Sequence, residues 1–243
     1  MSKHAAIKHL KRDKVLAGII NKIGVLEPRG DKDLYLSLLR SIVGQQLSVK
    51  AAATIWERFL NLFKDGYPSP EKVLKMKDEK LRAAGLSFQK AGYLKNIARF
   101  SIQETLDYGR LKHKQDDELI EYLVQIKGVG RWTVEMILMF SLDRPDVFPI
   151  DDLGIQNGIK ALYKVEAQKK ELLRQMTLIA ESWRPHRTLA CRYLWRYKDA
   201  ELFGKERTKT MPRSKRVAAK KSTNKPKPRK QRKPELKNSI KKT

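Results

Sequence analysis

The stretch that decides the fold is QIKGVGRWTVEMI, residues 125–137. Gly128 and Gly130 flank one apolar residue, and apolar residues at helical spacing follow. Glycine adopts backbone conformations that are closed to other residues, so we predict a tight turn that opens a helix. The free amides at a helix start attract an anion, and Lys127 and Arg131 add positive charge nearby. The stretch therefore predicts a site for one phosphate, although a plain turn between two helices would also explain the glycines.

The whole chain is strongly basic. Its 243 residues include 53 lysines and arginines against 27 aspartates and glutamates, a formal net charge of +26. Residues 205–243 hold 17 basic and 2 acidic residues, and residues 1–204 hold 36 and 25. Both parts favour a polyanionic partner, and nucleic acid is the usual one. The alternative for residues 205–243 is a solvated extension that only improves solubility.

Composition excludes several classes of protein. No apolar run approaches the roughly 20 residues that a membrane helix needs, so we expect no membrane partner. Charges interrupt the N-terminal segment, which argues against a signal peptide. Cys191 is the single cysteine, and this excludes an internal disulfide and a cysteine zinc site. The four histidines have no ligand spacing, and no cofactor is expected.

Helical spacing of apolar residues recurs along the chain, and strand-type alternation is almost absent. We predict an all-α domain of nine or ten helices in residues 1–204 and a disordered basic tail in residues 205–243, where apolar residues nearly vanish. Ser48, Ser69 and Asp117 are the expected helix caps, because their side-chain oxygens accept amide hydrogen bonds. Expected helices cover residues 34–43, 48–63, from 70 on, 78–85, 87–109, from 117 on, from 132 on, 152–163, 167–182 and 185–203.

Three separated motifs, the first of them in two parts, stand in the order that they have in one family. LVQIKGVGRWTVEMILMF, residues 123–140, resembles the helix-hairpin-helix of the DNA glycosylase superfamily named for that motif and a trailing Gly/Pro-Asp. DVFPIDDLGI, residues 146–155, supplies the proline and the aspartate. Residues 34–59, LYLSLLRSIVGQQLSVKAAATIWERF, look like the N-terminal half of the 3-methyladenine (alkylated-purine) DNA glycosylases, and residues 183–197, WRPHRTLACRYLWRY, resemble their last long helix. The resemblance covers about residues 25–200.

This resemblance implies an architecture and a partner. Two helical subdomains would enclose the active site in the cleft between them, with the helix-hairpin-helix on the DNA backbone. The partner would be double-stranded DNA containing alkylated bases, bound by a monomer, in the cytoplasm of a bacterium or the nucleus of a eukaryote. A monovalent cation would suit the carbonyls of Val124, Ile126 and Val129. The expected phosphate contacts are Lys127, Gly128, Val129, Gly130 and Arg131.

The resemblance also implies that the essential carboxylate is Asp152, 24 residues after Gly128. Loss of the base leaves an oxocarbenium-like sugar, which a carboxylate about 4 Å away attracts by roughly 4 kcal/mol at an effective dielectric near 20. A cationic base departs as a neutral molecule, so no general acid is required. The neighbouring Asp151 is the alternative, because either aspartate suits a helix start.

Trp132 stands where superfamily members that cut the strand have a nucleophilic lysine. An indole cannot form a Schiff base, so the resemblance implies a monofunctional glycosylase that leaves an abasic site. The alternative is that Trp132 only packs in the core.

The base pocket is expected to have aromatic walls. A cationic purine is attracted to an electron-rich ring by roughly 0.5–2 kcal/mol, a shallow preference that predicts a broad substrate range. The resemblance points to Trp132 and Trp195 as walls, with Tyr193 as a weaker candidate. Met136 stands where relatives have an aromatic residue.

The loop GQQLS, residues 44–48, resembles the wedge that enters the minor groove in this family. A wedge holds open the gap left by a flipped base, and flipping costs a few kcal/mol. Gln46 and Leu47 are both candidates to fill the gap, and Gln46 departs from the apolar residue of relatives. The alternative is a simple turn between two helices, with Ser48 as the following cap.

Two other functions also fit these motifs. The first is a helix-hairpin-helix glycosylase for an oxidised or deaminated base, which the expected pocket walls disfavour. The second is a non-catalytic DNA-binding protein that kept the hairpin. A binder has no reason to keep an unpaired carboxylate facing phosphates, so Asp152 favours an enzyme.

Overall fold

The computed structural model describes residues 3–27, 32–104 and 106–197. These residues form helices and no strands, which confirms the prediction of an all-α fold. None of the helices within these ranges has the length and apolar character needed to cross a membrane. The expected disordered tail over residues 205–243, and with it the expected boundary at residue 204, lies outside the described residues.

The helices are more numerous than the nine or ten expected. In the described residues, twelve helices precede a further helical segment over residues 187–197. Their bounds are α1 (Lys3–Leu10), α2 (Lys14–Ile23), α3 (Leu34–Gly44), α4 (Val49–Leu60), α5 (Pro70–Lys75), α6 (Asp78–Ala83), α7 (Phe88–Gln103), α8 (Tyr108–Leu111), α9 (Asp116–Leu123), α10 (Arg131–Phe140), α11 (Leu153–Tyr163) and α12 (Lys169–Glu181).

Two differences explain the wrong count. The N-terminal helices α1 and α2 are absent from the prediction. The single helix expected over residues 87–109 is instead α7 followed by the short α8. Asp107 begins this new helix by accepting the Arg110 amide at 2.7 Å, which is the role of an N-cap residue.

The expected caps are only partly right. Ser48 caps α4, as expected, by accepting an amide at 3.3 Å. Ser69 precedes Pro70, the first residue of α5, but its hydroxyl makes no capping bond. Asp117 is not a cap, because α9 already begins at Asp116. The acidic side chains in the first turn of α9 instead stabilise the helix by interacting with the positive end of its dipole.

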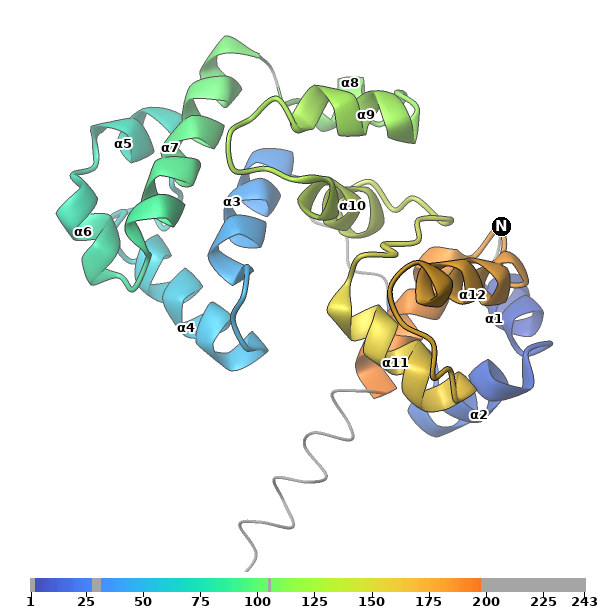
Figure 1. The fold of residues 1–243 in the computed structure, drawn as a ribbon. Coiled ribbons are helices and arrows are strands. Elements are labelled where there is room, and N and C mark those ends of the chain that lie inside the picture. The colour runs from blue at the N-terminus through green and yellow to red at the C-terminus, as the bar shows by residue number, and fades with distance from the viewer. Residues whose placement is uncertain (1–2, 28–31, 105, 198–243) are drawn as a thin grey trace, which may run out of the picture. The chain divides into compact units, whose positions relative to one another are not determined.

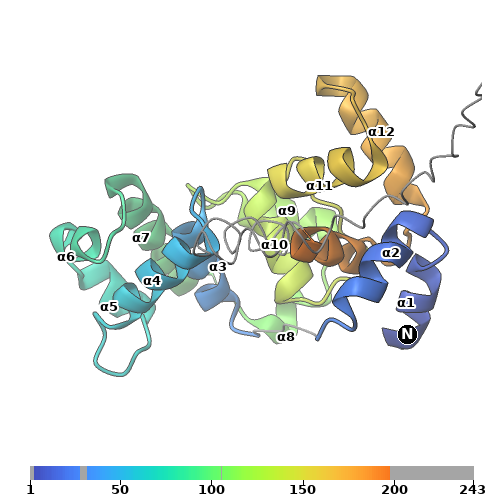
Figure 2. The same ribbon diagram turned by 90° about the horizontal axis from the view of Figure 1, so that it is seen from below.

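Two groups of helices meet at α10. Helix α3 packs against α4, α7 and α10, and both α5 and α6 pack against α7. Figures 1 and 2 show α3–α7 on one side of α10, and α1, α2, α11 and α12 on the other. Every residue from Thr133 to Met139 is buried, so α10 has the all-round contacts of an internal helix. The hairpin helix therefore lies between these two groups of helices.

Long-range hydrogen bonds join the start of α2 to the end of α11 and to the turn after α12. Asp13 caps α2, accepts the Tyr163 hydroxyl at 2.6 Å and accepts the Trp183 indole N–H at 3.0 Å. Tyr163 and Trp183 lie 150 and 170 positions further along the chain. This junction holds the turn that precedes segment 187–197, the segment on which Trp195 lies.

Candidate active site and DNA interface

Asp152 is the N-cap of α11, and its carboxylate is surrounded by N–H donors. Oδ1 accepts the Ile155 backbone amide at 2.8 Å and the Trp195 indole N–H at 2.9 Å. Oδ2 accepts the Trp132 indole N–H at 2.8 Å. A carboxylate offers roughly four acceptor positions, so these three bonds leave one on Oδ2. Three elements of the fold thus hold the carboxylate and still leave it an open position.

The two indoles reach Asp152 from different helices. Trp132 is the second residue of α10, and Trp195 lies on segment 187–197. Both rings are half-buried, and Trp195 contacts Phe140 in a tilted arrangement with ring centroids 5.8 Å apart. The structure therefore brings together the three residues that the sequence proposed as catalytic group and pocket walls.

Gly154 leaves the space that this arrangement needs. A Cβ at Gly154 would lie 2.8 Å from Asp152 Oδ1 and 3.0 Å from Nε1 of Trp195. Such distances are too short for non-bonded atoms, so a larger residue would displace the carboxylate or the indole. Sequence reasoning missed Gly154, because its role depends on a ring that is brought in from segment 187–197.

The alternative aspartate, Asp151, is exposed and does not cap the helix. Met136 is buried in α10, one helical turn after Trp132. Tyr193 is fully buried and donates its hydroxyl to the Gly24 carbonyl at 3.0 Å. That position makes Tyr193 part of the core contact with the N-terminal helices.

Glu135 is a buried acid that sequence reasoning did not single out. Its carboxylate accepts the Nε–H of exposed Arg131, one turn earlier on α10, at 3.3 Å. Burial raises the pKa of Glu135 despite the opposing effect of Arg131, and the charges of Asp151 and Asp152 add to the rise. The spacing of four residues signals the ion pair in the sequence, but the burial follows only from the packing of α10.

The glycine turn joins α9 to α10 and is supported by α7. Val129 is buried, as the motif predicts, whereas Lys127 and Arg131 are exposed. Gly128 has a φ of +105°, and a Cβ there would lie 2.2 Å from the Tyr93 ring. The turn therefore requires glycine at this position both for its backbone conformation and for the contact with α7.

Gly130 does not need glycine for its backbone conformation. Its φ of −97° is open to any residue, and a Cβ there would meet no atom within 4 Å. The expectation of two special glycine conformations is therefore wrong for Gly130. As the N-cap of α10 it makes no side-chain cap bond, so the first amides of the helix remain available to a ligand.

The carbonyls proposed to bind a cation lie in the same turn. The Ile126 carbonyl already accepts the Val129 amide at 2.9 Å, and a carbonyl oxygen has a second lone pair. Among the described residues, no cluster of three or more histidine, cysteine or acidic side chains has the geometry of a metal site. A cation on the hairpin carbonyls stays a prediction.

The GQQLS loop leaves the end of α3 as an exposed turn. Gln46 and Leu47 are both exposed, with 38% of Leu47 accessible. Gln45 is half-buried, and its side-chain amide donates to Oγ1 of Thr133 at 3.2 Å. Thr133 follows Trp132 in α10, so the loop lies beside the start of the hairpin helix.

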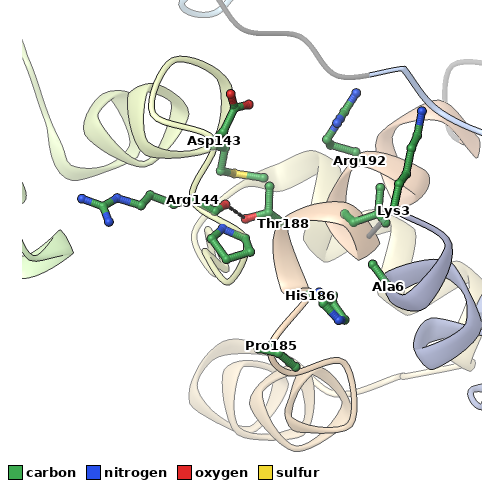
Figure 3. A pocket seen from close by; sticks show the side chains of 11 residues that line it. Lys3, Ala6, Asp143, Arg144, Pro185, His186, Thr188 and Arg192 are labelled. Atoms are coloured by element: carbon green, nitrogen blue, oxygen red, sulfur yellow. Dashed lines mark hydrogen bonds between the residues drawn. The ribbon is translucent and has the colours of Figure 1, made fainter. Parts of the chain in front are cut away.

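A cavity of about 560 Å³ lies elsewhere, between α1, the loop after α10 and segment 187–197 (Figure 3). Neither Asp152 nor its two indole donors line it. Two of its cationic side chains are paired with acids of the protein: Lys3 with Glu27 at 3.2 Å, and Arg144 with Asp116 at 3.1 Å. We therefore place the candidate active site at Asp152 and not in this cavity.

Comparison with known proteins shows the family of this chain. Residues 39–185 match the family described as HhH-GPD superfamily base excision DNA repair protein. DNA-3-methyladenine glycosylase 1 of Schizosaccharomyces pombe is 41% identical over 169 residues, which are 68% of this chain and 72% of that protein. YfjP of Bacillus subtilis is 36% identical over 172 residues, again 68% of this chain but only 59% of that protein. The match thus spans less than two thirds of the length of YfjP.

A solved structure extends the comparison. The S. pombe 3-methyladenine DNA glycosylase Mag1 in complex with abasic DNA superposes with a TM-score of 0.73 at 38% identity, covering 79% of this chain and 95% of that chain. The fold defines a class of protein: a helix-hairpin-helix protein that has a carboxylate, here Asp152, at the start of the helix that follows the hairpin. The chain belongs to the HhH-GPD superfamily of base excision DNA repair proteins and, within it, to the 3-methyladenine DNA glycosylase family. The resemblance inferred from the sequence is confirmed.

Proposed function

We propose that this chain is a monofunctional DNA glycosylase. It would flip an alkylated purine, such as 3-methyladenine, out of double-stranded DNA and hydrolyse its N-glycosidic bond to leave an abasic site. The observation that carries the proposal is the Asp152 carboxylate held between the Trp132 and Trp195 indoles. Family membership supplies the reaction class, since these enzymes are N-glycosyl hydrolases of base excision repair.

Asp152 acts on the sugar in this mechanism. The N-glycosidic bond breaks with its electron pair going to the base, so a cationic purine leaves as a neutral molecule. The deoxyribose becomes oxocarbenium-like, and the fixed negative charge of Asp152 stabilises it without reorganisation. Water then adds to the anomeric carbon and loses a proton to the solvent. The open acceptor position on Oδ2 suits this water or the sugar itself.

The indoles have two roles in the proposal. Their N–H groups orient Asp152, and their rings provide electron-rich faces for a cationic base. Trp132 occupies the place of the lysine nucleophile of strand-cutting relatives, and its N–H bond to Asp152 gives it a function beyond core packing. We infer that the enzyme has no lyase activity.

The hairpin and the GQQLS loop would bind the DNA around this site. Exposed Lys127 and Arg131 flank the open amides at the start of α10, which suits a phosphate. Gln46 and Leu47 are exposed on the loop beside α10 and are the proposed wedge. Binding through phosphates predicts an affinity that falls steeply as salt is raised.

Base release from defined DNA tests the proposal. Duplexes that each carry one alkylated, oxidised or deaminated base are incubated with the protein, and the released base is identified by chromatography. We expect release of several alkylated purines. Release of only an oxidised or deaminated base would support the second glycosylase function, and no release at all would support a DNA-binding protein.

Borohydride trapping tests the monofunctional assignment separately. Borohydride reduces a Schiff base between an enzyme lysine and an abasic site to a stable adduct. We expect no trapped adduct on abasic DNA, because Trp132 cannot form the imine. A trapped adduct would contradict the absence of lyase activity while leaving the glycosylase function intact.

A further inference from the structure

Residues 44–47 form a β-turn of a defined type at the proposed wedge. Gln45 has φ −53° and ψ 134°, Gln46 has φ +57°, and the Leu47 amide donates to the Gly44 carbonyl at 3.3 Å. A type II turn has about (−60°, +120°) at its second residue and a positive φ at its third. The third position favours glycine, so a glutamine there is strained. Local strain of this kind persists only where surrounding contacts impose it.

Lys90 supplies those contacts from α7. Its ammonium donates to the Val43 carbonyl at 2.9 Å and to the Gln45 carbonyl at 2.7 Å. Type I and type II turns differ mainly in the orientation of their central peptide, which here joins Gln45 to Gln46. The Gln45 carbonyl belongs to that peptide. A donor placed against it therefore selects the type II form and holds Gln46 at positive φ.

Lys90 is poorly placed for α7 itself. Ser87 is the N-cap and accepts the Lys90 amide at 3.1 Å, which puts the lysine at the third helical position. Glutamate or glutamine is favoured there, and a cation is disfavoured by the helix dipole. Burial also lowers the pKa of Lys90. A buried lysine at this position goes against the preferences of the helix start, which indicates that Lys90 has a role outside its own helix.

A second contact joins the turn to the hairpin helix. The Gln45 side-chain amide donates to Thr133 Oγ1 at 3.2 Å, next to Trp132 in α10. The turn is thus fixed from α7 through a carbonyl and from α10 through a side chain. Both contacts hold Gln45 and leave the neighbouring Gln46 exposed.

We propose that Lys90 is a positioning residue for base flipping: it holds the 44–47 turn in the type II form and so presents Gln46 to the gap left by the flipped base. This inference rests on the proposed wedge function of Gln46 and Leu47. Lys90 itself does not touch the substrate. Its effect appears only where the wedge is needed.

The experiment compares two duplexes that differ in the cost of flipping. Both carry the alkylated purine that the full chain releases fastest. In one the lesion faces its normal partner base, and in the other it faces a tetrahydrofuran abasic analogue, so that no base pair has to be broken. Single-turnover base release is measured for the unaltered chain, Lys90→Met, Lys90→Arg, Gln46→Ala and Leu47→Ala. Lys95→Met is the matched control, because Lys95 is on the same helix but pairs with Asp78.

The expected result is a selective loss. Lys90→Met slows release about tenfold from the paired duplex and less than about twofold from the unpaired one, since flipping an unpaired base costs less. Lys90→Arg keeps donors and retains most of the rate. Lys95→Met leaves the rate of base release from both duplexes unchanged. When Gln46→Ala is already present, adding Lys90→Met slows base release little further. Lys90 acts through Gln46 in this proposal, so the effects of the two substitutions are not additive.

Several outcomes overturn the inference. Equal slowing on both duplexes would make Lys90 a structural residue, and no slowing on the paired duplex while Gln46→Ala is slow would remove its positioning role. If neither Gln46→Ala nor Leu47→Ala slows the paired duplex, the wedge function itself fails. If Lys90→Met does not fold, Lys90→Gln replaces it, because this shorter side chain cannot reach both carbonyls. Normal release by Lys90→Gln from the paired duplex would then reject the proposal.

Discussion

Asp13 and Asp152 are two helix-capping aspartates with nearly the same local structure and different surroundings. Asp13 caps α2 through the amides of Val15 and Leu16, and its second oxygen accepts a tyrosine hydroxyl and the Trp183 indole. Four donors fill its acceptor positions. Asp152 caps α11 with one amide and accepts two indoles, so a position remains on Oδ2. The structural carboxylate of Asp13 and the proposed reactive carboxylate of Asp152 thus differ in how many donors reach them.

The neighbouring residues follow the same division. Trp183 is fully buried, whereas Trp132 and Trp195 are half-buried. Two positions after the cap, α2 has a valine and α11 has Gly154, where a Cβ would press on both Asp152 and Trp195. The comparison indicates that a common capping motif becomes a candidate active site when one acceptor is left open beside accessible rings.

The largest effect is expected for Asp152→Asn. The amide removes a negative charge worth roughly 4 kcal/mol to a nearby cation, so base release should fall about a thousandfold. Single-turnover release from alkylated DNA measures this. The exposed neighbour provides the control, since Asp151→Asn should stay within about twofold of the unaltered rate. Wild-type release by Asp152→Asn would place the chemistry elsewhere.

Removing one indole N–H while keeping an aromatic ring is the next test. Trp132→Phe and Trp195→Phe should each lose a charge-assisted hydrogen bond to Asp152 and slow release by roughly 10- to 100-fold. Trp183→Phe makes the same change at Asp13, and there thermal stability should fall while release from the folded protein is unchanged. If the Phe variants at the active site release base normally, the rings alone matter and the N–H bonds are incidental.

Gly154→Ala introduces one methyl group at the carboxylate. The added Cβ would displace Asp152 or Trp195, and we expect release to slow about tenfold with little change in melting temperature, because a small misplacement of a reacting group is costly. Gly158→Ala on the same helix is the control, since its Cβ would be 3.5 Å from Leu194. Equal activity of the two variants would show that the carboxylate tolerates movement.

The smallest effect on catalysis is expected for Asp13→Asn. Its amide nitrogen would face the buried Trp183 N–H, and a lost buried hydrogen bond costs about 2 kcal/mol of unfolding free energy. Urea unfolding followed by circular dichroism measures this change. Base release at 25 °C should remain within about twofold of the unaltered rate. A large loss of activity in fully folded Asp13→Asn would erase the distinction between the two aspartates.

The fold was largely accessible from the sequence because apolar spacing repeats at the helical period. The helical regions at α3, α10 and α11 follow from that pattern, and family motifs identified Asp152 as the candidate. The break between α7 and α8 was missed, because a cap at Asp107 interrupts an otherwise continuous polar and apolar pattern. The pair α1 and α2 was also missed, although Asp13 before KVLAGIINKI carries a capping signal.

The contacts within the site were not accessible from the sequence. The indoles that bind Asp152 lie 20 and 43 positions away, so their meeting depends on how three elements pack. The burial of Glu135 and the hydrogen bond from Lys90 to the Gln45 carbonyl also depend on packing between distant segments. By contrast, the need for glycine at position 128 was correctly inferred, because a positive φ is a local requirement.

In the proposed mechanism, the edge-on contact of both tryptophans with Asp152 would link selection of the damaged base to the cleavage step. If the rings line the pocket as proposed, a base that stacks badly tilts an indole and thereby disturbs the carboxylate that the indole holds. Discrimination would then appear in the rate of bond breaking as well as in affinity. A substitution of either tryptophan that widened the range of lesions would also remove a hydrogen-bond donor to Asp152, so it would need a replacement donor.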